Sequence, residues 1–139
     1  AEATGLRVTA VASVSEALVE ADAVFAATAS GSPVLSEDDL KTAAHLSVVG
    51  GDPRTKQVSQ GLLTTRPIVA DHREQARVSG DFVEEGRASL VSDDSPTLGD
   101  AALGRLEHRR GEGAIAYLTG LAAQDLVIAV EALNRTLWS

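Results

Sequence analysis

The residues best suited to chemistry lie in a turn near the middle of the chain. A short apolar run, Leu46–Val49, is followed by Gly50, Gly51 and Asp52. In an open α/β sheet, ligands bind at the carboxyl ends of strands, and glycines there let the backbone approach a ligand closely. The pattern predicts that Asp52 is a reactive carboxylate beside Gly50 and Gly51. The alternative is a structural turn aspartate before Pro53, which is common at strand ends.

Two other apolar runs end in small polar residues. One is followed by Thr28 and Ser30, and another, near the C-terminus, by Thr119 and Gly120. Just past a strand, such residues lie at the crevice where open α/β sheets bind their ligands. The alternatives are a capping or loop-forming role for Thr28 and Ser30, and a plain strand-to-helix hinge for Gly120.

The elements that must position these residues alternate along the first half of the chain. Apolar, β-branched runs predict strands, and segments with helix-start signals separate them. The strands are expected at residues 6–11, 23–29, 46–49 and 68–70, and the helix starts at residues 13–16, 36–39 and 71–74. Strand and short helix in alternation predict right-handed βαβ units and a parallel sheet.

The second half of the chain begins with a loop-rich stretch over residues 81–100. A short helix over 97–103, ending at Gly104, a polar turn over 105–113, a strand over 115–118 and a closing helix over 121–137 follow. We expect residues 1–120 to form a partial Rossmann-like nucleotide-binding domain of the α/β class, with an incomplete parallel sheet and short crossover helices. The helix within 121–139 is mostly apolar, so we expect it to pack on the sheet or on a partner.

Composition excludes several classes of protein. The chain has 139 residues, a formal net charge of −8 and no cysteine. The acidic balance argues against nucleic-acid and anionic-membrane partners. The lack of cysteine excludes disulfides and thiolate metal sites, and it is compatible with the cytoplasm, where we expect the protein. The three histidines are widely separated, so we predict no metal site.

The ordered set of motifs resembles the ornithine cyclodeaminase/μ-crystallin family, whose members are NAD(P)-dependent enzymes of amino acids and cyclic imines. The resemblance runs over essentially the whole chain. It rests on residues 15–17, 21–30, 33–35, 49–53, 61–63, 69–71, 80–81, 98–100 and 119–125.

The resemblance implies an ornithine cyclodeaminase, a ketimine or pyrroline-carboxylate reductase, or an alanine-type dehydrogenase. In such an enzyme Asp52 would manage a proton or water at the carbon that faces the nicotinamide. The residues expected to line the cofactor, NAD or NADP with a slight preference for NAD, are Thr28, Ser30, Gly50, Gly51, Thr119 and Gly120. The expected partners are a small amino acid or imine substrate and a second subunit, or a missing half on another chain.

The sequence departs from the family pattern in two places. The chain lacks the N-terminal domain with the substrate-binding basic residues and the strand that leads into a Gly-x-Gly-x-x-Ala phosphate turn. Residues 111–116 match that pattern, but they precede a strand instead of following one, so we do not interpret them as a phosphate turn. We therefore expect the C-terminal portion of such an enzyme. The turn after Asp52 reads Pro53-Arg54-Thr55-Lys56-Gln57, where the family usually has a second glycine and an acid. The rival hypothesis is a non-catalytic fragment, or a binding or structural module.

Overall fold

The computed structural model describes residues 5–41, 44–106 and 112–137, except for the side chain of residue 137. Four parallel strands form one sheet in the order β1-β2-β4-β3. Their bounds are β1 Ala23–Ala26, β2 His45–Val49, β3 Ile68–Ala70 and β4 Ile115–Leu118. The predicted α/β class with a parallel, Rossmann-like sheet is confirmed.

The chain order explains which loops meet at the carboxyl edge of the sheet. Strand β4 lies between β2 and β3, with Leu46 and Ile68 both opposite Ile115. The chain thus leaves β2, forms the outer strand β3, and returns to fill the gap with β4. Because all pairs are parallel, the turns that follow the four strands meet at one edge.

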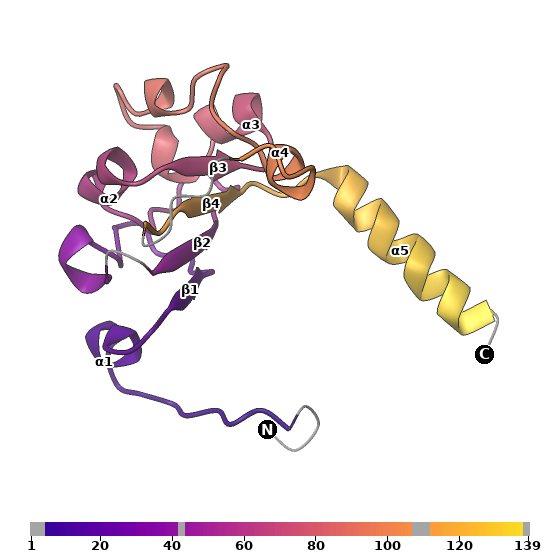
Figure 1. Ribbon diagram of the computed structural model, residues 1–139, viewed down its shortest axis with the longest axis horizontal. Coiled ribbons are helices and arrows are strands. Elements are labelled where there is room, and N and C mark those ends of the chain that lie inside the picture. Colours follow the sequence, from indigo (N-terminus) through magenta and orange to yellow (C-terminus); the bar gives the residue numbers. More distant parts are fainter. Residues whose placement is uncertain (1–4, 42–43, 107–111, 138–139) are drawn as a thin grey trace.

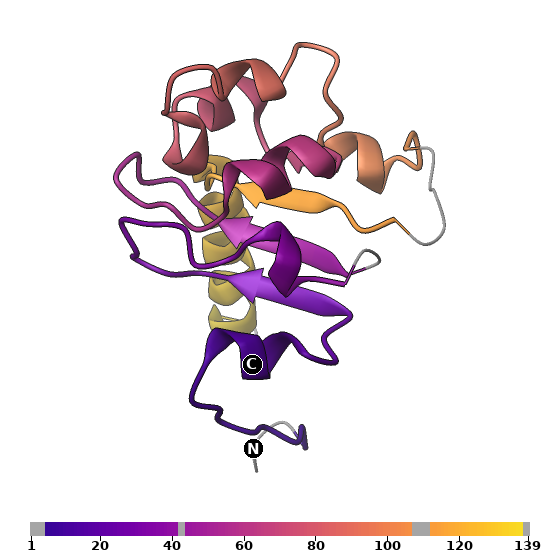
Figure 2. The ribbon, with the colours of Figure 1, turned by 90° about the vertical axis from the view of Figure 1, so that its left-hand side faces the viewer.

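Short helices lie against one face of this sheet and around its β3 edge (Figure 1 and Figure 2). They are α1 Val14–Leu18, η1 Glu37–Asp39, α2 Gln60–Thr65, α3 Arg73–Arg77, η2 Gly80–Phe82, η3 Ala88–Leu90 and α4 Leu98–Ala102. The core beneath them contains fully buried Leu46, Val48, Ile115 and Tyr117 from the central strands. Alternate residues of the edge and neighbouring strands point to the other face, where Phe25 and Val49 are exposed.

The helix starts read from the sequence are largely confirmed by capping contacts. The Ser13 hydroxyl accepts a hydrogen bond from the Glu16 amide at 3.2 Å, and Thr97 and Asp100 form a reciprocal capping box. Gly104 follows the α4 turn with φ +67°. Ser59, which also caps a helix, has the same signal, but the sequence reading did not use it to predict α2.

The prediction of a strand at residues 6–11 is wrong, because these residues form no part of the sheet and are exposed. An apolar β-branched run suits a strand only where a neighbouring strand edge is available to pair with it. Strand β1 also ends at Ala26, three residues before the expected end at residue 29. Most of the polar turn expected over 105–113 lies outside the described residues.

The closing helix α5, Ala122–Leu137, extends away from the sheet (Figure 1). Its large apolar side chains are exposed, including Leu126, Ile128 and Leu133. The expectation that this helix packs on the sheet or on a partner stays a prediction. Among the described residues, no helix combines the length and apolar character that crossing a membrane requires.

Candidate functional site

The predicted site residues all follow strands at the carboxyl edge. The segment after β1 is the Thr28 loop (residues 27–34), and the segment after β2 is the Asp52 loop (residues 50–57). The main-chain amide of Lys56 donates to the Ser30 carbonyl at 2.7 Å, so the two loops lie side by side. The exit of β4 completes the group with Thr119 and Gly120.

Close backbone packing joins the Asp52 loop to the exit of β4. A Cβ atom at Gly51 would collide with the Thr119 carbonyl oxygen, and one at Gly50 would collide with the Tyr117 hydroxyl. Both positions therefore require glycine for contacts within the chain. The structure thereby brings Gly51, the residue before Asp52, next to Thr119, which lies far along the sequence.

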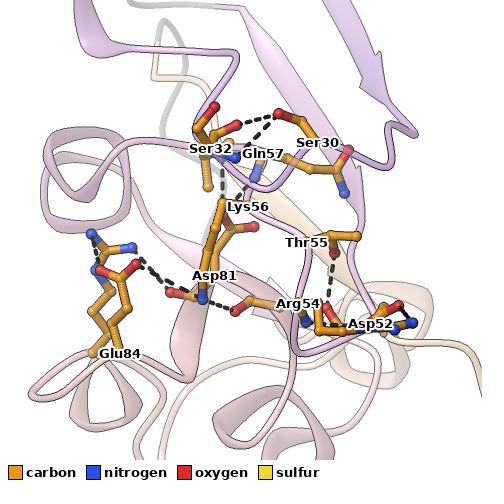
Figure 3. A network of polar contacts seen from close by, with 12 residues as sticks. Ser30, Ser32, Asp52, Arg54, Thr55, Lys56, Gln57, Asp81 and Glu84 are labelled. Carbon is orange, nitrogen blue, oxygen red and sulfur yellow. Dashed lines mark hydrogen bonds and ion pairs between the residues drawn. The ribbon is translucent and has the colours of Figure 1, made fainter.

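Asp52 is paired with Arg54, two residues further along the same loop (Figure 3). The guanidinium reaches both carboxylate oxygens, with Nε to Oδ1 at 3.1 Å and Nη2 to Oδ2 at 2.8 Å. The Arg54 side chain, followed by the Arg54 amide, lowers the pKa of Asp52 to about 2. The side chain of Arg54 is 89% exposed, so this ion pair is open to solvent and can be displaced by a bound charge.

Asp71 fixes the exit of β4, a role that the sequence reading missed. Its Oδ2 atom accepts hydrogen bonds from the Thr119 and Gly120 amides at 2.8 and 2.9 Å, and its Oδ1 atom accepts from the Thr119 hydroxyl at 2.8 Å. The sequence offered one sign of this role, because Asp71 directly follows β3, the strand that pairs with β4. Gly120 follows with φ +81°, a left-handed conformation that favours glycine.

Gln57 and Asp81 form a buried polar centre beneath the loops, also missed as site residues. Both are fully buried, and Asp81 accepts the Gln57 amide at 2.7 Å and the Val58 amide at 3.1 Å. The Tyr117 hydroxyl contacts Asp81 Oδ2 at 3.2 Å. Burial, with Asp81 nearby, raises the pKa of the Tyr117 hydroxyl, which therefore stays protonated. The glycine–aspartate pair Gly80-Asp81 was the only sequence signal.

The hydroxyls predicted to line a cofactor are already engaged within the chain. The Thr28 hydroxyl contacts Gln57 Oε1 at 3.3 Å, and the Ser30 hydroxyl donates to the Ser32 carbonyl at 2.6 Å. Gly31, directly after Ser30, has neither a positive φ nor any neighbour within 4 Å of an added Cβ. This glycine is unexplained by contacts within the chain, and it leaves the Thr28 loop open to close approach.

The described residues contain no group of three or more histidine, aspartate or glutamate side chains arranged to hold a metal ion. The site offers one solvent-accessible carboxylate, backbone amides held by the half-buried carboxylate of Asp71 and the buried carboxylate of Asp81, and glycines at the strand ends.

Sequence comparisons identify the family. The model of the ornithine cyclodeaminase/mu-crystallin family matches residues 1–137. A protein of Rhizobium meliloti named as a dehydrogenase is 32% identical over 124 residues, which are 86% of this chain and 38% of that protein. Iminosuccinate reductase of Paracoccus denitrificans is 28% identical over 113 residues, which are 79% of this chain and 35% of that enzyme.

Comparison with solved structures shows the same fold in a known enzyme. The Thermococcus litoralis Δ1-pyrroline-2-carboxylate reductase, solved with NADH and L-proline, superposes with a TM-score of 0.77 at 19% identity, over 91% of this chain and 41% of that one. The chain thus spans about two fifths of the length of these relatives. With the family model matched from end to end of the described sheet, the chain belongs to the ornithine cyclodeaminase/mu-crystallin family.

Proposed function

We propose that this chain forms the nicotinamide-facing part of an NAD(P)-dependent enzyme that exchanges hydride at an amino acid α-carbon or an imine carbon. The observation that carries the proposal is the convergence of the Asp52 loop with the exit of β4, through the contact between Gly51 and the Thr119 carbonyl. This contact puts a solvent-accessible carboxylate at the carboxyl edge of a parallel sheet, where α/β enzymes bind their ligands.

The residues at this edge fit a nicotinamide nucleotide. Gly31 leaves the Thr28 loop open, and Gly120 is likewise free of neighbours within 4 Å of an added Cβ. Thr28, Ser30, Gly50, Gly51, Thr119 and Gly120 would hold the ribose and nicotinamide. The bound cofactor would supply the hydride or accept it, and the chain's own groups would orient the ring and exclude water.

Asp52 would handle charge and protons at the reacting carbon. In imine reduction the carbon takes the hydride and the nitrogen carries the proton, so the reacting group is a cation. With a pKa of about 2, Asp52 is an anion at neutral pH and would stabilise that cation. If a substrate carboxylate draws Arg54 away, the pKa of Asp52 rises toward the ordinary value, and Asp52 becomes a stronger base.

The substrate class is a small amino acid or a cyclic or open-chain imine, in line with the reactions named for the relatives. NAD is slightly favoured over NADP, because the reductase of known structure was solved with NADH. Since the chain spans about two fifths of its relatives, the activity belongs to the intact polypeptide or to its assembly.

The test is a substrate screen with the intact protein. Cyclic imines, iminosuccinate and 2-oxo acids with ammonia are offered with NADH or NADPH, and nicotinamide absorbance is followed. Ornithine is offered with NAD⁺, and ammonia release is followed. The proposal is supported if the wild-type protein turns over one of these substrates and Asp52→Asn does not. A folded protein that binds the nucleotide but turns over none of them would favour a non-catalytic binding protein.

A further inference from the structure

The side chain of Gln57 touches both loops of the proposed site from beneath. Its Oε1 atom accepts the Thr28 amide at 2.8 Å, and its Nε2 group donates to the Val49 carbonyl at the end of β2. The Gln57 side chain is fully buried. One amide group thus holds the first residues of the Thr28 loop against the strand from which the Asp52 loop begins.

The main chain of Gln57 extends the same connection. Its carbonyl accepts the amides of Val34 and Leu35, both at 3.0 Å. The Thr28 loop is therefore fixed at its start by the Gln57 side chain and at its end by the Gln57 backbone. Residue 57 itself closes the Asp52 loop.

Asp81 fixes Gln57 in turn. Its Oδ1 atom accepts the Gln57 and Val58 amides, and its own amide donates to the Tyr117 hydroxyl at 2.9 Å. The Tyr117 hydroxyl lies 3.1 Å from the Gly50 carbonyl, at the opposite end of the Asp52 loop. The adjacent Gly80 carbonyl accepts Lys56 Nζ at 2.8 Å. Both ends of the Asp52 loop are thus anchored to the turn formed by residues 79–83, the Asp81 turn (Figure 3).

The carboxamide of Gln57 satisfies backbone groups of opposite hydrogen-bonding character. The Thr28 amide requires an acceptor and the Val49 carbonyl requires a donor, and a carboxamide supplies one of each. A glutamate would place a carboxylate oxygen against the Val49 carbonyl, and an apolar side chain would leave both backbone groups without their partner. None of the buried side-chain polar atoms described is unpaired, so the network has no spare partner to offer.

We propose that Gln57, anchored by Asp81, is a positioning residue that couples the Thr28 loop to the Asp52 loop, so that the two sides of the crevice keep one relative geometry. The inference rests on the proposed function, because its consequence is the placement of Asp52 relative to a cofactor held by the Thr28 loop. Reactions between bound groups depend steeply on such placement.

The test combines hydrogen exchange with kinetics on the intact protein. Gln57→Met keeps the length of the side chain and removes its hydrogen bonds to the Thr28 amide, the Thr28 hydroxyl and the Val49 carbonyl. Single-residue amide exchange should become about tenfold faster at Thr28. It should stay slow at Val34 and Leu35, whose acceptor is the Gln57 backbone. Leu63→Ala, at a buried core residue of α2, is the control and should speed exchange broadly without singling out Thr28.

In the same variant, kcat should fall about tenfold to a hundredfold and the KM for the nucleotide should rise. The losses from Gln57→Met and Asp52→Asn should combine to less than their product, because Gln57 acts through the Asp52 loop. Gln57→Asn, which keeps the amide but is one methylene shorter, should show the same pattern more weakly, and it serves if Gln57→Met does not fold.

Unchanged exchange at Thr28 would overturn the coupling of the loops. Faster exchange at Thr28 with wild-type kcat and KM would overturn the positioning role. A wild-type protein that neither binds a nucleotide nor turns over any imine would instead contradict the proposed function, and the exchange at Thr28 would still decide whether Gln57 couples the loops.

Discussion

The Asp52 loop and the Asp81 turn are joined by the hydrogen bond from Lys56 to the Gly80 carbonyl, yet their two aspartates have opposite surroundings. The partners of the Asp52 carboxylate come from Arg54, and its side chain is 41% exposed. The Asp81 carboxylate is fully buried, and its partners lie 23 to 36 residues away in the sequence.

This difference separates a group that is available for chemistry from a group that builds the site. A carboxylate held by an exposed arginine can exchange that partner for a substrate at small cost. A buried carboxylate that accepts backbone amides cannot lose them without leaving polar groups unsatisfied. We therefore expect substitutions at Asp52 to change turnover, and substitutions at Asp81 to change stability.

The largest expected effect is on the turnover of Asp52→Asn in the intact enzyme. Loss of the carboxylate should lower kcat by about 10²- to 10⁴-fold, while the dissociation constant of the nucleotide stays within about threefold of wild type. Steady-state kinetics and nucleotide titration measure the two quantities. Asp38→Asn, at an exposed residue of η1, is the control. Wild-type turnover in Asp52→Asn would remove the assigned role.

The next effect is on the stability of Asp81→Ala. The variant leaves the buried amides of Gln57 and Val58 without their acceptor, which should cost about 3 to 5 kcal/mol in the free energy of unfolding. Urea titration followed by circular dichroism measures it. Asp94→Ala, at an exposed loop residue, should change the same free energy by less than about 0.5 kcal/mol. Equal effects of the two variants would refute the anchoring role of Asp81.

A matched pair of glycines tests how closely the Asp81 turn packs on the Asp52 loop. Gly80 and Gly86 both have positive φ, but only at Gly80 would an added Cβ collide, with the Tyr117 hydroxyl and the Gly50 carbonyl. Gly86→Ala should lower the free energy of unfolding by about 1 to 2 kcal/mol from backbone strain alone. Gly80→Ala should lower it by about 1 to 3 kcal/mol more. A smaller loss for Gly80→Ala would contradict the packing.

The smallest effect is a shift in the titration of Asp52. In Arg54→Gln the pKa of Asp52 should rise from about 2 toward about 4, because the guanidinium that stabilises the anion is gone. The stabilisation that the wild-type pair contributes is complete above about pH 4 and is lost as the pH falls toward 2. Carboxyl NMR of Asp52 measures both pKa values. An unchanged pKa would show that Arg54 does not hold the carboxylate in solution.

The strands and turns of the site were readable from the sequence because their signals are local. The run Leu46–Val49 and the glycines that follow predicted a strand and its exit, and the structure has them within one residue. The apolar run over residues 115–118 likewise predicted a strand, β4, with Thr119 and Gly120 at its exit. These patterns depend on the alternation of apolar runs and turn residues, which needs no knowledge of distant contacts.

The roles of Gln57, Asp71 and Asp81 were not readable, because their partners are distant in the sequence. Asp71 binds amides 48 and 49 residues away, and Gln57 binds Thr28 across 29 residues. Which strand lies beside which decides these contacts, and the insertion of β4 between β2 and β3 does not follow from local patterns. The prediction of a strand over residues 6–11 was wrong for a related reason, since a strand requires a neighbouring strand to pair with.

The central claim is that the carboxyl edge of this sheet binds a nicotinamide nucleotide, and Gly31 offers the most direct test of it. A Cβ atom added at residue 31 meets nothing within 4 Å in the chain, so we expect Gly31→Leu to fold normally and to project into the space that the nucleotide needs. The measurement is a calorimetric titration of NADH and NADPH into the intact wild-type protein, Gly31→Leu, and Gly31→Ala as the control for the backbone. Saturable binding to wild type and Gly31→Ala, weakened about tenfold or more in Gly31→Leu, is the predicted result. Equal binding to all three proteins, or binding to none, would contradict a nucleotide site at this edge.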